Sequence, residues 1–177
     1  MTRIEVAGRA DAAVVGRLLA QFNAEFDTPS PTAEQFAARF ARLLAREDVL
    51  VLLSASDEEF RRAGDTVSGA TGFAFITLRS TPYYDGPLSQ LEELYVVPSL
   101  RDRGIGTQLL RAALEAVQAR GAGEMHINVD EVDTDTRRFY ERHGFTNIEA
   151  DGRMLCYVQE LPPPSDPPSV PENCESW

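Results

Sequence analysis

The chain has 177 residues, of which 43% are hydrophobic, and its 28 acidic and 17 basic residues give a formal net charge of −11. This length and apolar content suit one domain with a single core, which we expect over residues 1–160. The acidic balance argues against nucleic-acid and membrane partners. Because no apolar run is long enough for a membrane span or a signal peptide, we expect a cytoplasmic protein.

The N-terminal region is predicted to form a strand followed by two helices. Residues 3–7 alternate apolar and polar side chains as a strand does, and residues 11–26 carry apolar side chains at helical spacing. Thr32 followed by Gln35 forms a capping box, which indicates where the second helix begins.

The next segment is predicted to contain three strands. The apolar run 49–53 is typical of a buried strand, and residues 67–78 return to strand composition after a polar stretch at 55–65, which we expect to be a loop or partly helical. The loop 79–88, with the sequence RSTPYYDGPL, then leads into a third strand at 91–97.

Two glutamates stand side by side in this third strand, at Glu92 and Glu93. An ionised carboxylate inside a sheet is costly unless it is hydrogen-bonded, paired or hydrated, so two in succession suggest a water-filled cleft. Strand alternation would send the two side chains to opposite faces, unless a bulge re-aims one of them.

The chain breaks at Pro98, reads RDRGIG at 101–106, and enters a helix predicted over 106–120. Gly104 and Gly106 remove side chains where the helix begins, so free backbone N–H groups can approach an anion. The helix dipole and the two arginines favour negative charge there. The spacing indicates a diphosphate-binding loop; the alternative is a turn that needs two glycines beside solvated arginines.

The remaining elements follow in short segments. Gly121 ends the helix, residues 124–129 are predicted to form a strand, and Asp133 or Thr134 caps a last helix that stops at Gly144. Together with the strand at 91–97, these signals predict the order strand, helix, strand, helix for residues 91–144.

The C-terminal segment combines a hairpin with a proline-rich end. Residues 147–160 contain two short strand candidates joined at Asp151–Gly152, and residues 161–177 carry six prolines, which predicts an extended or disordered tail. We expect no disulfide between Cys156 and Cys174. Neither cysteine has a zinc-ligand spacing with a histidine, so we expect no metal site.

Two of these stretches resemble motifs of the GNAT acetyltransferase superfamily. The loop 101–106 is similar to Arg/Gln-x-x-Gly-x-Gly/Ala, and residues 133–145, read DTDTRRFYERHGF, are similar to Asn-x-x-Ala-x-x-Phe-Tyr-x-x-x-Gly-Phe, with Asp133 in place of Asn and Thr136 in place of Ala. The resemblance covers residues 3–160. It implies an α/β (α+β) fold, with a mixed, largely antiparallel sheet of about seven strands, helices on both faces and a splayed central strand pair.

The resemblance implies acetyl-CoA as a co-substrate and no metal. The end of the central strand would contact the pantetheine arm through its backbone, the N–H groups of the loop would bind the diphosphate, and one contact is carried over to position 133. The implied cofactor-binding residues are Tyr95, Val96, Val97, Arg101, Asp102, Arg103, Gly104, Ile105, Gly106, Thr107 and Asp133.

The implied catalytic residues are Glu92, Glu93 and Tyr140. The run LEELYV at 91–96 is similar to a Leu-Glu-Asp-Phe-Phe-Val run of polyamine acetyltransferases. This similarity implies that Glu92 takes the substrate proton through water and that Glu93 positions the substrate. Pairing of the glutamates with neighbouring arginines is the alternative. Tyr140 would protonate the departing thiolate, and its alternative is a core tyrosine on a helix.

The loop 79–88 would lie at the acceptor side, where Tyr83, Tyr84 and Asp85 could select an amine; an exposed loop tip explains them equally well. The first two helices would wall the same site. Glu25, Asp27 and Glu34 could therefore meet a cationic substrate there, but solvated helix surface is the simpler interpretation.

The sequence thus predicts acetyl transfer from acetyl-CoA to a primary amine by direct attack in a ternary complex. The acceptor could be a small-molecule amine or a protein or peptide amine, and a homodimer is among the forms that the resemblance allows. The alternative function is an acyl-CoA-binding regulatory or interaction domain without transfer activity, a hypothesis to which Asp133 and Thr136 lend weight.

Overall fold

The computed structural model describes residues 2–26, 29–56 and 69–161, and it divides into two compact units, Met1–Asn128 and Val129–Trp177. The first unit contains β1 (Thr2–Val6), a 3-10 turn (Arg9–Asp11), α1 (Ala12–Asn23), α2 (Ala33–Leu43), β2 (Val49–Ser56), β3 (Gly72–Arg79), β4 (Leu88–Val96), a 3-10 turn (Pro98–Leu100), α4 (Ile105–Gln118) and β5 (Met125–Ile127). The predicted order of strands and helices is confirmed.

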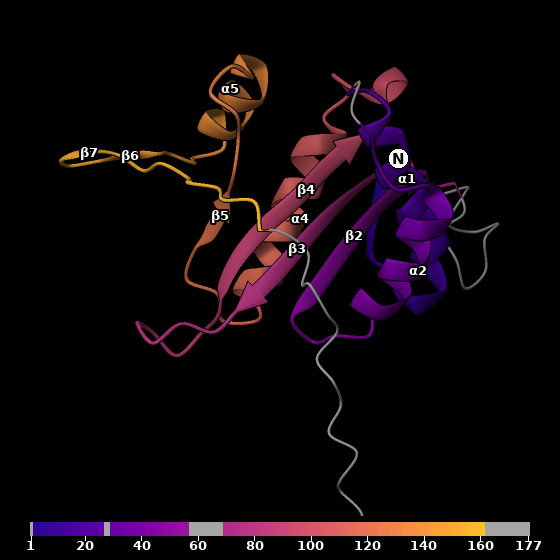
Figure 1. Cartoon of the computed structure of the whole chain (residues 1–177), viewed down its shortest axis with the longest axis horizontal. Coiled ribbons are helices and arrows are strands. Elements are labelled where there is room, and N and C mark those ends of the chain that lie inside the picture. The colour runs from indigo at the N-terminus through magenta and orange to yellow at the C-terminus, as the bar shows by residue number, and fades with distance from the viewer. Residues whose placement is uncertain (1, 27–28, 57–68, 162–177) are drawn as a thin grey trace, which may run out of the picture. The chain divides into compact units, whose positions relative to one another are not determined.

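The first unit is built on a five-stranded sheet with the order β1-β2-β3-β4-β5 (Figure 1). Every neighbouring pair is antiparallel except β4 and β5, which run parallel. With the two short strands of the second unit, the described residues contain seven strands. The prediction of a mixed, largely antiparallel sheet is confirmed.

Helices cover both faces of this sheet (Figure 1). On one face, α1 and α2 contribute Val15, Leu18, Phe36 and Phe40 to a core that includes Val51, Leu53, Phe73 and Tyr95 from alternate strand positions. On the other face lies α4. A Cβ added at Gly72 would meet a methyl carbon of Leu109 from α4 at 3.2 Å and the carbonyl oxygen of Tyr95 at 2.6 Å. A glycine therefore lets the helix and β4 approach β3 closely.

The capping box predicted for α2 is present at its N-terminus. The backbone N–H of Gln35 donates to the Thr32 hydroxyl at 3.3 Å, and the Gln35 side chain accepts from the Thr32 N–H at 2.9 Å. The two bonds satisfy N–H groups that a helix end would otherwise leave unpaired, so this local signal places the helix start correctly.

The second unit contains α5 (Thr134–Arg142) and a hairpin of β6 (Ile148–Glu149) and β7 (Gly152–Arg153). α5 begins after Asp133, whose carboxylate accepts the Thr136 N–H at 3.1 Å, and ends before Gly144, which has a φ of 89°. The sequence predicted the cap, the stop and the hairpin.

Some predictions fall outside the described residues. Residues 57–68 and 162–177 are not described, so the predicted loop beyond residue 56, the proline-rich tail, the domain boundary at residue 160 and the state of Cys174 stay predictions. Of the helices in the described ranges, none is both long and apolar enough to cross a membrane.

Candidate active site

The two ends of β4 are paired differently. Its N-terminal part pairs with β5 through Ser89–Leu91 opposite Met125–Ile127, and both the N–H and the hydroxyl of Ser89 donate to the carbonyl oxygen of Glu124, at 3.2 and 2.7 Å. After Leu91, no strand among the described residues pairs with this edge of β4. β4 and β5 therefore form a wedge that is closed at Ser89.

The open edge of β4 presents backbone groups. The N–H of Val97 donates to Thr71 O at 2.9 Å on the β3 side, and bonding direction alternates along a strand, so Leu94 and Val96 turn their backbone groups toward the open edge. Of the three residues predicted to contact pantetheine, Val96 faces this edge. Tyr95 and Val97 turn their N–H groups toward β3, and the expected contact of this backbone segment with pantetheine stays a prediction.

A bulge occurs in β4 at Glu92. Phe75 on β3 lies opposite Glu93, whereas the next residue, Ile76, lies opposite Leu91, so Glu92 is the extra residue. A bulge breaks the alternation of side chains. The two glutamates are therefore not forced to opposite faces of the sheet.

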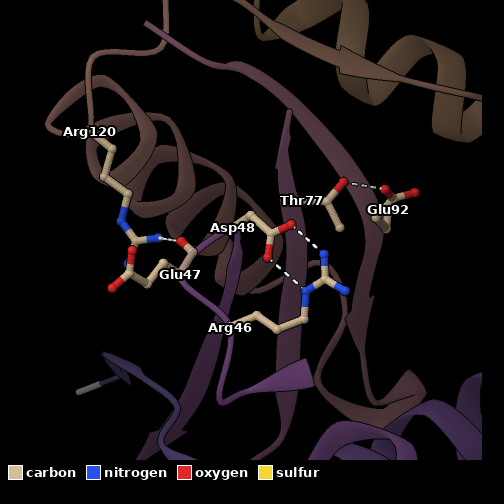
Figure 2. Close-up of polar contacts among 6 residues, drawn as sticks. All are labelled: Arg46, Glu47, Asp48, Thr77, Glu92 and Arg120. Atoms are coloured by element: carbon tan, nitrogen blue, oxygen red, sulfur yellow. Dashed lines mark hydrogen bonds and ion pairs between the residues drawn. The ribbon is translucent and has the colours of Figure 1, made fainter. Parts of the chain in front are cut away.

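Both glutamates lie on the face covered by α1 and α2. The hydroxyl of Thr77, the partner of core residue Val49, donates to Oε1 of Glu92 at 2.5 Å (Figure 2). Glu93 lies opposite Phe75, which packs against this core. The bulge thus brings two carboxylates together beside the open edge of β4.

The electrostatics of the pair differ between its members. Glu92 is exposed and Glu93 is half-buried. Burial, and secondarily the charge of Glu92, raise the pKa of Glu93 to about 7. A carboxylate with a pKa near neutrality is a better proton acceptor than an ordinary glutamate and is still ionised in part at pH 7.

The sequence RDRGIG at 101–106, called here the glycine loop, leads into α4. Gly104 has a φ of 77° and Asp102 a φ of 59°, so both adopt the left-handed conformation. The first helical hydrogen bond runs from the Gln108 N–H to Gly104 O at 3.0 Å, which leaves the preceding N–H groups without helical partners. The first turn of α4 contains no acidic residue. This geometry suits an anion such as a diphosphate.

The two arginines of the glycine loop have different surroundings. The guanidinium of Arg101 donates to both carboxylate oxygens of Glu25, at 2.7 and 2.8 Å, and to Val96 O at 3.0 Å. Arg103 is exposed, and no ion pair or hydrogen bond of its side chain is seen within residues 2–26, 29–56 and 69–161. Sequence reasoning treated the two as equivalent.

The loop before β4 lies at the closed end of the wedge, whereas the glycine loop follows the other end of β4. The hydroxyl of Tyr84 donates to Glu124 Oε1 at 3.0 Å, and Tyr83 and Asp85 are exposed. Tyr84 thus fixes the loop to the start of β5, and its role in acceptor binding stays a prediction.

In the second unit, Tyr140 is 6% exposed. Its ring lies 5.1 Å from that of Phe139 and 5.4 Å from that of Phe145, both in edge-to-face contact. The aromatic residues of the 133–145 motif therefore pack around Tyr140, and Asp133 caps the helix that carries it.

Sequence reasoning missed two polar partners. Thr77 carries no local signal, because its contact with Glu92 depends on the bulge in the neighbouring strand. Glu25 was considered as a substrate-facing residue, but its carboxylate pairs with Arg101, 76 positions along the chain.

Glu34 lies in the first turn of α2, where backbone hydrogen bonding lowers its pKa, and Asp27 lies outside the described residues.

Residues 17–145 match the model of the Acetyltransferase (GNAT) family. The chain belongs to this family. A crystal structure from Arthrobacter sp. FB24, whose name describes an acetyltransferase, is similar to this chain. It is 42% identical, has a TM-score of 0.78, and matches over 90% of this chain and 96% of its own.

Two further similar proteins are named for aminoglycosides. Aminoglycoside N(6')-acetyltransferase type 1 of Klebsiella aerogenes is 29% identical over 75% of this chain and 83% of its own length. The structure of aminoglycoside N-acetyltransferase AAC(6')-Iy in complex with CoA is 21% identical, has a TM-score of 0.69, and matches over 91% of this chain and 96% of its own. At this identity the second comparison shows the fold alone.

Proposed function

We propose that this GNAT protein transfers the acetyl group from acetyl-CoA to a primary amine by direct attack in a ternary complex. The observation that carries the proposal is the pair Glu92 and Glu93, which the bulge brings to one face beside the open edge of β4. Membership of the GNAT family supports acetyl-CoA as the donor.

In this proposal the cofactor runs along the open edge. The free N–H groups at the start of α4, from Gly104 to Thr107, bind the diphosphate together with the helix dipole. The N–H groups of Leu94 and Val96 face the acyl arm, where a backbone donor stabilises negative charge that develops on the thioester oxygen. The left-handed residues Asp102 and Gly104 shape the turn between these two sets of donors.

Proton removal from the acceptor is the first chemical task. An amine with a pKa of about 10.4 is neutral in only about one molecule in 2,500 at pH 7, which corresponds to a deprotonation cost of about 4.6 kcal/mol. We assign proton acceptance to Glu93, because its pKa is raised to about 7, and binding of the substrate ammonium to Glu92, which is exposed. This assignment exchanges the roles expected from sequence similarity.

The neutral amine nitrogen then attacks the thioester carbonyl, the carbon–sulfur bond breaks, and the nitrogen releases its second proton to water as the amide forms. We propose that Tyr140 protonates the departing sulfur and regains a proton from water. A phenol with a pKa of about 10 can supply a proton to a thiolate whose conjugate acid has a pKa of about 8.5, with a modest driving force. The products are an N-acetyl amine and CoA thiol.

For the acceptor, we propose a cationic small-molecule amine. The net charge of −11 and the two clustered carboxylates favour a cation, and the Klebsiella aerogenes relative is named for aminoglycosides. A peptide or protein amine would present the same reacting group, so the acceptor panel includes both kinds.

Cofactor binding is tested by calorimetric titration of acetyl-CoA into the unmodified protein and into Gly104→Glu and Gly104→Gln. A Cβ at Gly104 meets no atom within 4 Å, and both substitutions place a non-glycine residue at a φ of 77°, so they share the same backbone strain. They differ in charge alone. We expect stoichiometric binding by the unmodified protein, moderate weakening in Gly104→Gln and loss in Gly104→Glu; equal binding by the two variants would contradict a diphosphate at this loop.

Transfer is tested by thiol release with a panel of aminoglycosides, polyamines, amino acids and peptides. We expect release with a cationic small-molecule amine. Acetyl-CoA binding without thiol release from any acceptor would instead support a regulatory or interaction domain of GNAT fold.

A further inference from the structure

The side chain of Arg101 is held at three points. Its Nε donates to Val96 O at 3.0 Å, and its Nη2 donates to both carboxylate oxygens of Glu25. Its guanidinium carbon lies 5.7 Å from the centre of the Tyr95 ring. These contacts connect the glycine loop to the end of β4 and to the turn that follows α1.

The Glu25 end of this connection is itself fixed. The N–H of Glu25 donates to Phe22 O at 3.1 Å, and the ring of Phe22 packs 5.4 Å from that of Tyr95. Burial, and then the charge and hydrogen bond of Glu25, raise the pKa of Tyr95, so Glu25 also acts on this buried tyrosine. Charge-assisted bonds from a planar guanidinium to a fixed carboxylate and a carbonyl are geometrically specific.

The same contacts engage the charge of Arg101 and three of its five N–H donors, those on Nε and Nη2. Glu25 balances its positive charge, and its Nε occupies the Val96 carbonyl, which faces the open edge of β4. An incoming cofactor at this position therefore meets a guanidinium whose charge is already paired, together with the Val96 N–H and the N–H groups at the start of α4. The exposed Arg103 is then the arginine of the glycine loop whose charge is available to phosphate.

Given the proposed function, we infer that Arg101 is a positioning residue. Its guanidinium clamps the glycine loop to β4 and to the end of α1, and it orients the N–H groups that bind the diphosphate without binding the diphosphate itself. The clamp consists of Arg101 and Glu25. Acetyl-CoA affinity therefore depends on Glu25, which lies in the turn that follows the helix expected to wall the acceptor site.

The substitution Glu25→Ala distinguishes this role from direct phosphate binding, because the two roles predict changes of opposite sign in the Kd for acetyl-CoA. If Arg101 bound phosphate, Glu25→Ala would release its guanidinium and remove a nearby negative charge, so acetyl-CoA would bind more tightly. If the clamp is right, Glu25→Ala loosens the glycine loop, and the Kd for acetyl-CoA rises about fivefold.

A second substitution tests geometry at constant charge. Arg101→Lys keeps the positive charge but has no fork that reaches both Glu25 and Val96 O, so we expect a similar rise of about fivefold in Kd. The double variant should bind no more weakly than either single variant, because both break the same clamp. Arg103→Gln should weaken binding independently of Glu25 and reduce the dependence of Kd on salt concentration.

Arg120→Lys is the matched control. Arg120 also ties two parts of the first unit by donating to a backbone carbonyl, that of Glu47 at 3.3 Å, but it follows the C-terminal end of α4 (Figure 2). The glycine loop lies at the other end of this 14-residue helix. We expect the Kd of Arg120→Lys for acetyl-CoA to match that of the unmodified protein.

The experiment is a calorimetric titration of acetyl-CoA at two salt concentrations, with circular dichroism to verify that each variant is folded. Tighter binding by Glu25→Ala, or unchanged binding by Arg101→Lys, overturns the clamp while leaving the proposed function intact. No binding by the unmodified protein overturns both. If Glu25→Ala does not fold, the Arg101→Lys titration decides, since that variant keeps the charge and loses the geometry.

Discussion

The two halves of β4 contrast in pairing and in content. From Ser89 to Leu91 the strand has partners on both edges, and three of the four residues 88–91 are buried. From Glu93 to Val96 it is paired with β3 alone among the described residues. The first half carries Leu88, Ser89 and Leu91 in the core; the second begins with two carboxylates. Backbone N–H groups that lack a strand partner can bind a ligand, so the same strand holds the sheet together at one end and, in the proposed function, takes part in the reaction at the other.

The largest contrast should appear in stability. Leu91 is 1% exposed in the doubly paired half, so Leu91→Ala should lower the free energy of unfolding by about 2–5 kcal/mol. Leu94 is half-buried beside the open edge, so Leu94→Ala should lower the free energy of unfolding by roughly 1 kcal/mol. Urea denaturation measures both. Equal losses would mean that the two halves are packed alike.

Turnover should depend more on the second half of β4 than on the first. Glu93→Gln keeps the shape of the side chain but removes the proposed proton acceptor, and we expect a fall of about a hundredfold in turnover, or about 2.7 kcal/mol. In the unmodified protein kcat/KM should rise with pH through about 7, because the ionised form of Glu93 accepts the proton. A pH profile that is unchanged in Glu93→Gln would remove this residue from the mechanism. Leu91→Ala, where folded, should keep the profile.

The pH dependence of stability gives an independent measure of Glu93. Its pKa is about 7 in the folded chain against 4.5 as the ordinary value, so the folded state retains a proton that the unfolded state has lost between these two pH values. The free energy of unfolding should therefore fall as pH rises from about 4.5 to 7, by about 1–3 kcal/mol. Glu93→Gln should remove this decline and be the more stable protein at pH 8. Urea denaturation at pH 5 and pH 8 distinguishes these outcomes.

The smallest effect is expected at Thr77. Thr77→Val removes the hydroxyl that donates to Glu92 at 2.5 Å, and because that contact is exposed, the stability loss should stay below about 1 kcal/mol. Turnover should fall a few-fold, since Glu92 loses one restraint but keeps its charge. A fall in turnover as large as that of Glu93→Gln would show that the Thr77 hydroxyl matters to turnover as much as the Glu93 carboxylate does.

Local signals allowed much of the fold to be predicted. The Thr32–Gln35 capping box, the apolar spacing of α4 and Gly104 before it each depend on residues within one or two turns, so the order of elements could be predicted. The bulge could not be located, since it exists only as the register of β4 against β3: Phe75 meets Glu93 and Ile76 meets Leu91. The Arg101–Glu25 pair was missed for the same reason, because a contact across 76 positions leaves no pattern in either segment.

The two hydrogen bonds from Ser89 to Glu124 O fix β4 to β5 at the closed end of the wedge. Val96 lies seven residues further along β4, which at roughly 3.3 Å per residue is an arm of about 23 Å. A rotation of about 5° at this point would move Val96 by roughly 2 Å, which is large compared with the clearance of a close-packed fit. If acetyl-CoA binds along this edge as we propose, changes around the buried Ser89 should alter how closely its acyl arm fits.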